Sequence, residues 1–336
     1  MLFFGSGSEK VDGVNLFSLM ERFVKSFQGR DSSLSPENDF LSEIRAFFND
    51  GFVKNKACQK AKIFQSGHSP RNSESEEELL KGRSHSTIQA GGWETVITLN
   101  GNMLIPRGKW LLLCEDYEPA RVYSEWSLPL TRHYRLERQI LLAFCEKIFW
   151  VADSLIPEKP VRPGYLCYES RFPWGGTVVK PEDPDANELV FMSGDSAEKS
   201  RKVRVLPIGL PEWKTESEGG LLQDSGSLVL RQDKTGTALF APLFFDFDSA
   251  RANRACTWRH LTVGERLAPV SSDIAVGYRV QLGAIHYLIY RSLAPSANRT
   301  VLGHNLLSEF LFARFSHAEN VTPIVEIENH TEEQCS

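Results

Sequence analysis

The sequence predicts a mainly β fold: a large antiparallel, supersandwich-like β-sandwich with a short helical N-terminal segment. From residue 91 onward, short β-prone runs alternate with turn signals, and most show no helical period between them. Within 274–315, a glycine turn, strict alternation and a cluster of polar groups occur together. This pattern favours antiparallel layers over a parallel α/β sheet.

The N-terminal residues, 1–64, are predicted to be helical. Ser35 and Pro36 suit the start of a helix, and Gly51 suits its end. Two apolar stripes at helical spacing, one around Phe17 and one around Ile44, must pack on each other, on the β domain or on a partner protein. Packing on the β domain is the favoured interpretation.

Three further segments complete the predicted organisation. Residues 65–90 are rich in Ser, Glu, Lys, Arg and Gly and are predicted to be a mobile polar linker. The β-sandwich domain is predicted to span 91–329, and 330–336 form a tail.

Two turn motifs predict hairpins early and midway along this domain. Asn100-Gly101 suits a type I′ turn between 94–99 and 102–105. The run from Asp233 to Gly236 predicts a hairpin loop between 227–232 and 237–248. Further strands are expected at 109–116, 165–172, 188–193, 201–210, 257–263, 307–315 and 321–328.

The strongest hairpin signal is the dipeptide Gly283-Ala284 between 275–282 and 285–293. Glycine in the first central position fits a type II′ turn and fixes the register. One face then consists of three apolar pairs: Leu282 with Ile285, Val280 with Tyr287, and Tyr278 with Ile289. The other face is polar and pairs Gln281 with His286, Arg279 with Leu288, and Gly277 with Tyr290.

Residues 134–150 are ambiguous between a helix and a hairpin. Leu136, Ile140, Phe144 and Ile148 recur every four residues, which is typical of a helix. A hairpin turning at Glu146-Lys147 is the alternative that we prefer.

Composition limits the classes of function. The net charge is -5, from 38 basic and 43 acidic residues, so no basic surface for nucleic acid is expected. The first ten residues do not resemble a secretory signal, and 139–156, the most apolar run, is interrupted by charges, so we expect a soluble, cytoplasmic protein without a membrane span. The six cysteines show no C-x-x-C spacing, and no cofactor is expected.

Two passages resemble a known enzyme family. They are Arg138-Gln-Ile-Leu-Leu-Ala-Phe-Cys-Glu-Lys-Ile-Phe-Trp-Val-Ala-Asp153, and Ala241-Pro-Leu-Phe-Phe-Asp-Phe-Asp248 with Thr257-Trp-Arg-His-Leu-Thr262. The first resembles a strand pair of heparinase II/III-type polysaccharide lyases, and 93–328 is similar in size to the β-sandwich part of such enzymes. The passage 290–305 resembles bacterial proteins of unknown function, some of them linked with that family. The resemblance implies a sandwich with a carbohydrate context, but the α/α-toroid that supplies most catalytic groups of those lyases has no counterpart here.

The predicted loop 291–309 and the polar hairpin face contain the candidate site residues. His304, His286 and Tyr290 are the catalytic candidates, because histidine can act as a general base near neutral pH. Binding of a uronic acid carboxylate would use arginines and polar groups. The candidates for this role are Arg279, Gln281, Arg291, Arg299 and Asn305. The alternative, which we favour, is that these side chains only satisfy the backbone of a long loop.

Two other groups are candidates for binding. Asp246 and Asp248 are two apart on a predicted strand and could bind a cation, but an ordinary salt-bridged strand end is the preferred interpretation, and no metal is expected. Trp258 could stack on a sugar ring, but core packing is the commoner role of a large aromatic side chain.

Three functions are compatible with the sequence. The leading hypothesis is a non-catalytic binding or accessory module that recognises a polysaccharide or oligosaccharide. The second is a polysaccharide lyase or hydrolase acting on glycans that contain uronic acid. The third is a protein-interaction scaffold whose N-terminal helices dock on a partner.

Overall fold

The computed structural model describes residues 44, 87–90, 92–174, 177–179, 184–193, 201–315 and 321–328. From residue 87 onward this part of the chain consists of β-strands and their connections, with short 3₁₀ turns at Thr131–His133 and Lys214–Glu216. The predicted mainly β class is therefore confirmed. No helix within these residues is long and apolar enough to cross a membrane.

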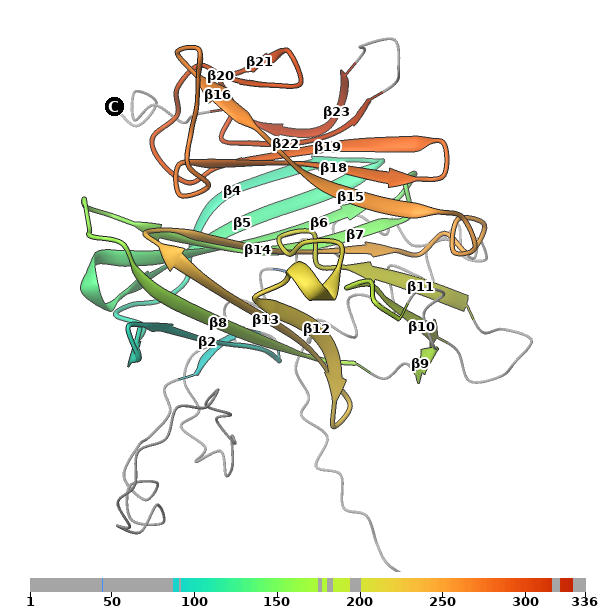
Figure 1. The fold of residues 1–336 in the computed structure, drawn as a ribbon, viewed down its shortest axis with the longest axis horizontal. Coiled ribbons are helices and arrows are strands. Elements are labelled where there is room, and N and C mark those ends of the chain that lie inside the picture. The colour runs from blue at the N-terminus through green and yellow to red at the C-terminus, as the bar shows by residue number, and fades with distance from the viewer. Residues whose placement is uncertain are drawn as a thin grey trace, which may run out of the picture.

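The strands form four antiparallel sheets (Figure 1). In spatial order, the central sheet contains β4 (Leu111–Glu118), β5 (Arg121–Leu130), β6 (Tyr134–Ala143), β7 (Ile148–Pro157), β14 (Leu239–Asp246), β11 (Arg201–Leu206), β10 (Leu189–Ser193) and β9 (Thr177–Val179). The lower sheet contains β1 (Ile88–Ala90), β2 (Trp93–Leu99), β8 (Gly164–Pro173), β13 (Ser227–Gly236) and β12 (Gly219–Asp224), and β3 (Asn102–Met103) pairs with β2.

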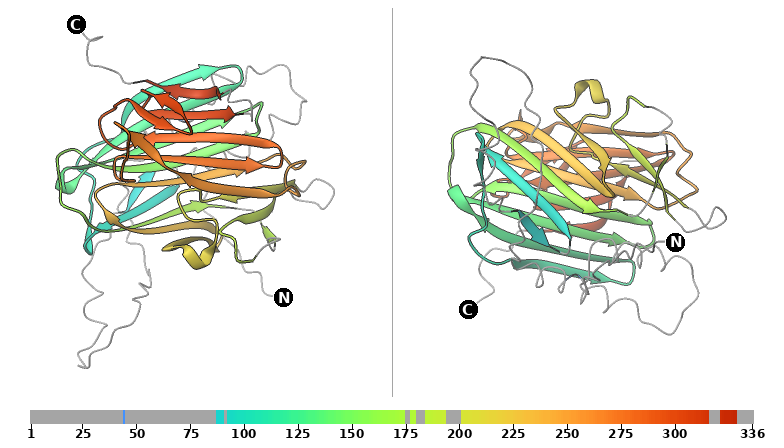
Figure 2. Two further views of the ribbon diagram at one scale, coloured as in Figure 1. Left: turned by 45° about the horizontal axis from the view of Figure 1, so that its top comes forward. Right: turned by 90° about the horizontal axis from the view of Figure 1, so that it is seen from below.

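Two sheets lie on the opposite side of the central sheet (Figures 1 and 2). The upper sheet contains β15 (Cys256–Leu261), β18 (Ala275–Leu282), β19 (Ile285–Ser292), β22 (Phe310–Phe315) and β23 (Val321–Ile327). The cap sheet contains β17 (Ala268–Pro269), β16 (Val263–Glu265), β20 (Arg299–Val301) and β21 (His304–Leu306).

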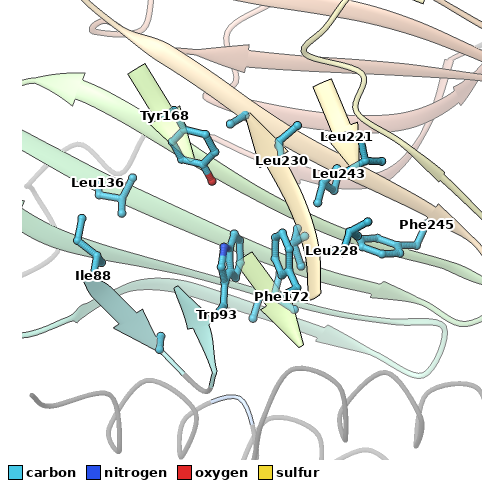
Figure 3. Close-up of a cluster of buried hydrophobic side chains, with 14 of the residues drawn as sticks. Ile88, Trp93, Leu136, Tyr168, Phe172, Leu221, Leu228, Leu230, Leu243 and Phe245 are labelled. Carbon is cyan, nitrogen blue, oxygen red and sulfur yellow. The ribbon is translucent and has the colours of Figure 1, made fainter. Parts of the chain in front are cut away.

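The central sheet buries apolar side chains on both faces. Leu136 of β6 packs into the core shared with the lower sheet (Figure 3), as does Ile140, whereas Leu141 and Ala143 pack into the core shared with the upper sheet. Side chains alternate between the two faces of a strand, so a strand buried on both sides reads as an almost continuous apolar run. This is why 134–150 also fits a helical pattern.

A third, smaller core joins the upper and cap sheets. Leu288, Tyr290 and Leu311 of the upper sheet pack against Val263 and Val301 of the cap sheet. Gly277 permits this close approach, because a Cβ at this position would lie 3.2 Å from Val301 Cγ1.

Three predicted hairpins are confirmed. The pairing around Gly283-Ala284 is the predicted one throughout, from Leu282 with Ile285 to Gly277 with Tyr290. Asn100 and Gly101 both have positive φ, at 51° and 74°, and Leu99 pairs with Asn102. β6 and β7 form the preferred hairpin of 134–150, with Ala143 opposite Ile148, so the turn spans residues 144–147.

The hairpin predicted at 233–236 is wrong. β13 continues through these residues, and Gly236 pairs with Gly164 of β8. β14, which follows, pairs with β7 and β11 in the central sheet. The polar residues that resemble a turn therefore end a strand, and the chain then crosses from the lower sheet to the central sheet.

Two predicted irregular segments contain strands. The loop predicted at 291–309 contains the hairpin of β20 and β21, turning at Leu302-Gly303. Residues 88–90 of the predicted linker form β1 of the lower sheet. The rest of that linker up to residue 86, and the tail 330–336, lie outside the described residues.

Of the predicted helical segment 1–64, only Ile44 is described. It is helical, fully buried and part of the core between the lower and central sheets. This contact supports the prediction that the helical stripe around Ile44 packs on the β domain.

Candidate functional site

The outer face of the upper sheet carries two accessible members of the candidate site. Arg279 and Gln281 of β18 are partly exposed, whereas their neighbours Val280 and Leu282 point into the core with the central sheet. The cap sheet covers the part of this face around Gly277, Leu288 and Tyr290. We call Thr257, Arg259, Arg279, Gln281 and His286, which share the other end, the outer polar face.

Two arginines stand opposite each other on this face. Arg259 of β15 pairs directly with Arg279 of β18 in the strand register. Directly opposed side chains on adjacent antiparallel strands lie about 5 Å apart at Cβ, so like charges here destabilise the sheet. Arg259 has a counter-ion, Glu212, at 3.2 Å. Within the described residues, no carboxylate pairs with Arg279.

The neighbours of these arginines are polar or aromatic. Gln281 donates its amide to the carbonyl of Gly283 at 3.1 Å, which holds it near the turn. His286 is buried, and its ring packs edge-on against Phe315 with centroids 5.3 Å apart. The outer polar face therefore places the amide of Gln281 beside Arg279, which has no carboxylate partner among the described residues.

Arg299 is buried and anchors the cap sheet. Its guanidinium donates to Glu265 at 3.0 Å and to the carbonyl of Pro295 at 2.9 Å. It also donates to the hydroxyl of Ser292 at 2.6 Å and to that of Tyr290 at 3.2 Å. Tyr290 is fully buried. Both side chains therefore stabilise the connection between the upper and cap sheets. This agrees with the alternative interpretation, in which the polar side chains of the loop bond to the protein itself.

Arg291 points the other way, into the interface with the central sheet. It donates to Glu125 at 2.5 Å and also to Glu137. Burial disfavours the charged form, but the two carboxylates outweigh it and raise the pKa of Arg291. Burial also raises the pKa of Glu309 nearby. Arg291 is about 2 % exposed and links the upper sheet to the central sheet through these ion pairs, so we call it an interlayer tie.

The remaining catalytic candidate, His304, lies on β21 of the cap sheet, whereas His286 lies on β19 of the upper sheet. Asn305, next to His304, is exposed and accepts a hydrogen bond from Thr300 at 3.1 Å. The structure thus places the two histidines on different sheets.

Trp258, Asp246 and Asp248 have partners within the protein. Trp258 is buried, and its indole N–H donates to the carbonyl of Leu210 at 2.8 Å. Asp246 is buried and pairs with Arg251 at 2.7 Å, and Asp248 lies 3.3 Å from Lys147. Among the residues that the structure describes, no three His, Cys, Asp or Glu side chains are grouped to hold a metal.

Arg259 and Glu212 belong to this site but were not predicted. Arg259 lies in a predicted strand, but the sequence does not reveal which strand lies beside it. Only the pairing of β15 with β18 places it opposite Arg279.

The sequence matches no protein-family model and no curated protein. Among solved structures, the chain is similar to the heparan sulfate lyase HepC from Pedobacter heparinus, at 12% identity and a TM-score of 0.40, over 66% of this chain and 33% of that one. It is also similar to a heparinase III gene product, at 10% identity and a TM-score of 0.38, over 73% and 33% of the two chains. A heparinase III structure gives 11% identity and a TM-score of 0.37, over 59% and 29%. The resemblance is distant, and the matched part is about a third of the length of those proteins.

Proposed function

We propose that this protein is a non-catalytic binding module for an acidic polysaccharide or oligosaccharide, which it binds on the outer polar face. The observation that carries the proposal is that Arg259 and Arg279 oppose each other, and that among the described residues Glu212 pairs with Arg259 whereas no carboxylate pairs with Arg279. A carboxylate or sulfate group of a ligand would supply the missing counter-charge. Arginine suits this role because its planar donors bind such groups in a bidentate manner.

The neighbouring groups support the same use of the surface. Gln281 and Thr257 lie opposite each other in the register, one position along the face from the arginines. Their polar atoms could bind the hydroxyl groups of a sugar. The glycan part of the proposal rests on the sequence resemblance of 138–153, and of 241–248 with 257–262, to heparinase II/III-type lyases.

The burial of Arg291, Arg299 and Tyr290 supports a binding role over catalysis by these residues. Arg291 and Arg299 are neutralised by internal carboxylates, and the hydroxyl of Tyr290 is buried against Arg299. A general base and its partners must reach the substrate. These groups face into the protein.

The test measures binding of the full chain to heparan sulfate, to hyaluronan and to a neutral glucan. Affinity electrophoresis and calorimetry provide the measurements. The expected result is retention by the acidic glycans alone, with affinity falling as salt rises. Arg279→Ala should weaken binding roughly tenfold, as expected for a lost charged hydrogen bond. The matched control is Arg231→Ala, which removes an exposed arginine of the lower sheet. Absence of retention, or an equal effect of both substitutions, would overturn the proposal.

The same preparations decide the enzymatic alternative. A lyase would release products with an unsaturated uronate that absorbs ultraviolet light, and a hydrolase would release new reducing ends. Either product, formed by the native chain and lost in His304→Ala, would replace a pure binding role by catalysis at the cap sheet.

A further inference from the structure

A second group of positive charges lies beside the turn between β18 and β19. Arg254 is exposed, and its side chain runs beside Gly283, where an added Cβ would lie 2.9 Å from Arg254 Cδ. Lys202 of β11 donates to the side-chain oxygen of Asn253, the neighbour of Arg254, at 2.7 Å. We call Arg254 and Lys202 the turn-end cations.

The turn-end cations have no carboxylate partner among the residues that the structure describes. The acidic residues closest before Arg254 in the sequence are Asp246 and Asp248, and both pair with other basic side chains. Exposed charges of one sign that no internal group neutralises attract a ligand of the opposite charge. The turn-end cations are therefore available to an anion.

Main-chain hydrogen bonds hold Arg254 in place. Its N–H donates to the carbonyl of Arg251 at 2.9 Å, and its carbonyl accepts from Arg204 at 3.1 Å. The next residue, Ala255, accepts a hydrogen bond from the N–H of Gly283 at 2.9 Å. These bonds fix the backbone before a ligand binds, which lowers the cost of binding, and none of them depends on the Arg254 side chain.

The turn-end cations continue the outer polar face along β18. Gly283 follows Arg279 by four residues, which is about 13 Å at the rise of an antiparallel strand. Gln281 lies between them and donates to the carbonyl of Gly283 at 3.1 Å. A single sugar ring cannot reach both ends of this surface, whereas a chain with several anionic groups can. Contacts at both ends would reinforce each other, because the second contact of a linked ligand is intramolecular.

We propose that the outer polar face and the turn-end cations form one extended binding surface for a linear acidic glycan. One carboxylate or sulfate group binds Arg279, and a later one along the same chain binds Arg254 and Lys202. This inference rests on the proposed function and adds that the ligand is a polymer rather than a mono- or disaccharide. The amide of Gln281 lies between the two anion sites, where it faces the sugar units that connect them.

The test compares short and long ligands on the full chain. Calorimetry should show that a heparan sulfate decasaccharide binds roughly tenfold or more tightly than a disaccharide. Arg254→Ala and Arg279→Ala should each remove most of this gain, because each leaves only one end of the surface. Lys202→Ala should lower the affinity for the decasaccharide roughly three- to tenfold, as expected for a lost charged contact.

The matched control is Arg162→Ala, at an exposed arginine in the connection between β7 and β8, which should keep the full gain from ligand length. Circular dichroism must show that each variant is folded. A decasaccharide that binds no more tightly than the disaccharide, or equal losses in Arg254→Ala and Arg162→Ala, would overturn the extended surface and leave the proposed function standing. Equal affinity for inorganic polyphosphate would overturn its assignment to a glycan. Failure of both heparan sulfate ligands and of hyaluronan to bind would overturn both proposals.

Discussion

The guanidinium group of Arg138 lies over the indole ring of Trp93, with Cζ 3.6 Å from the ring centroid. Two of its nitrogens donate to the carboxylate of Asp153, each at 2.8 Å. The same carboxylate accepts hydrogen bonds from Thr95 and Tyr168 of the lower sheet. One buried charge pair therefore fixes the position of the lower sheet on the central sheet.

Breaking this pair on one side should be costly. Asp153→Asn leaves the Arg138 charge buried without a counter-ion, so we expect a loss of about 3–5 kcal/mol in the free energy of unfolding. Urea denaturation measures it. Glu169→Gln, which affects partly exposed ion pairs on the lower sheet, is the control and should cost less than about 1 kcal/mol. Equal losses would show that the buried pair has no special role.

The opposite interface depends on Arg291 in the same way. Arg291→Met should leave Glu125 and Glu137 facing each other without a cation and loosen the upper sheet selectively. Hydrogen exchange should therefore accelerate in β19 and β22 but not in β8 or β13 of the lower sheet. Uniform acceleration in all four strands would argue against a separate interlayer tie.

Acid should weaken the crossover between β13 and β14 through Asp273. Burial opposes ionisation of this carboxyl group, but the Lys234 ammonium group at 2.7 Å and the backbone N–H groups of Thr237 and Ala238 outweigh it and hold its pKa below the ordinary value. The unfolded carboxyl group binds protons more readily, so its stabilisation is complete above the unfolded pKa of about 3.9 and is lost as pH falls through the folded pKa.

Asp273→Asn tests this pH dependence. Near neutral pH the substitution should cost about 1–3 kcal/mol, because it removes a charged acceptor of three hydrogen bonds or ion-pair contacts. The difference from the native chain should shrink below about pH 4, where the native carboxyl group also becomes protonated. A difference that does not change with pH would contradict the assignment. Denaturant titrations across the acid range provide the measurement.

Ile44 should stabilise the β domain from a distant part of the sequence. Because it is fully buried in the core between the lower and central sheets, Ile44→Ala should lower the free energy of unfolding by about 2–5 kcal/mol. Ile105→Ala, at a side chain that is 41% exposed, should have a much smaller effect. Matching effects in thermal melts would mean that the N-terminal segment contributes nothing to that core.

The fold could be predicted where local chemistry determines it. Gly283 sets a turn, and period-2 alternation on both sides then fixes every pair of the β18–β19 hairpin. The turn prediction at 233–236 failed because the same polar residues can end a strand, and the choice depends on Gly164 of a strand about seventy residues earlier. The Leu302-Gly303 turn was missed because leucine rarely adopts a positive φ.

The site was less predictable than the fold. Its face follows from the hairpin register, which correctly placed Arg279 and Gln281 on the polar side. The hairpin register does not predict that Arg291 and Arg299 are buried in ion pairs. Their partners are Glu125, Glu137 and Glu265, which lie on strands whose position the local sequence does not determine. Long-range pairing of strands therefore decides which arginines are available to a ligand.

The doubly covered central sheet has a consequence for synthesis on the ribosome. β6 and β7 emerge from the ribosome with apolar side chains on both faces. The upper sheet, which covers one of these faces, begins only at Cys256, about a hundred residues after Pro157. At roughly 5–20 residues per second, the nascent chain exposes that face for about 5–20 s. A holdase chaperone that engages this hairpin during the delay would protect it from aggregation.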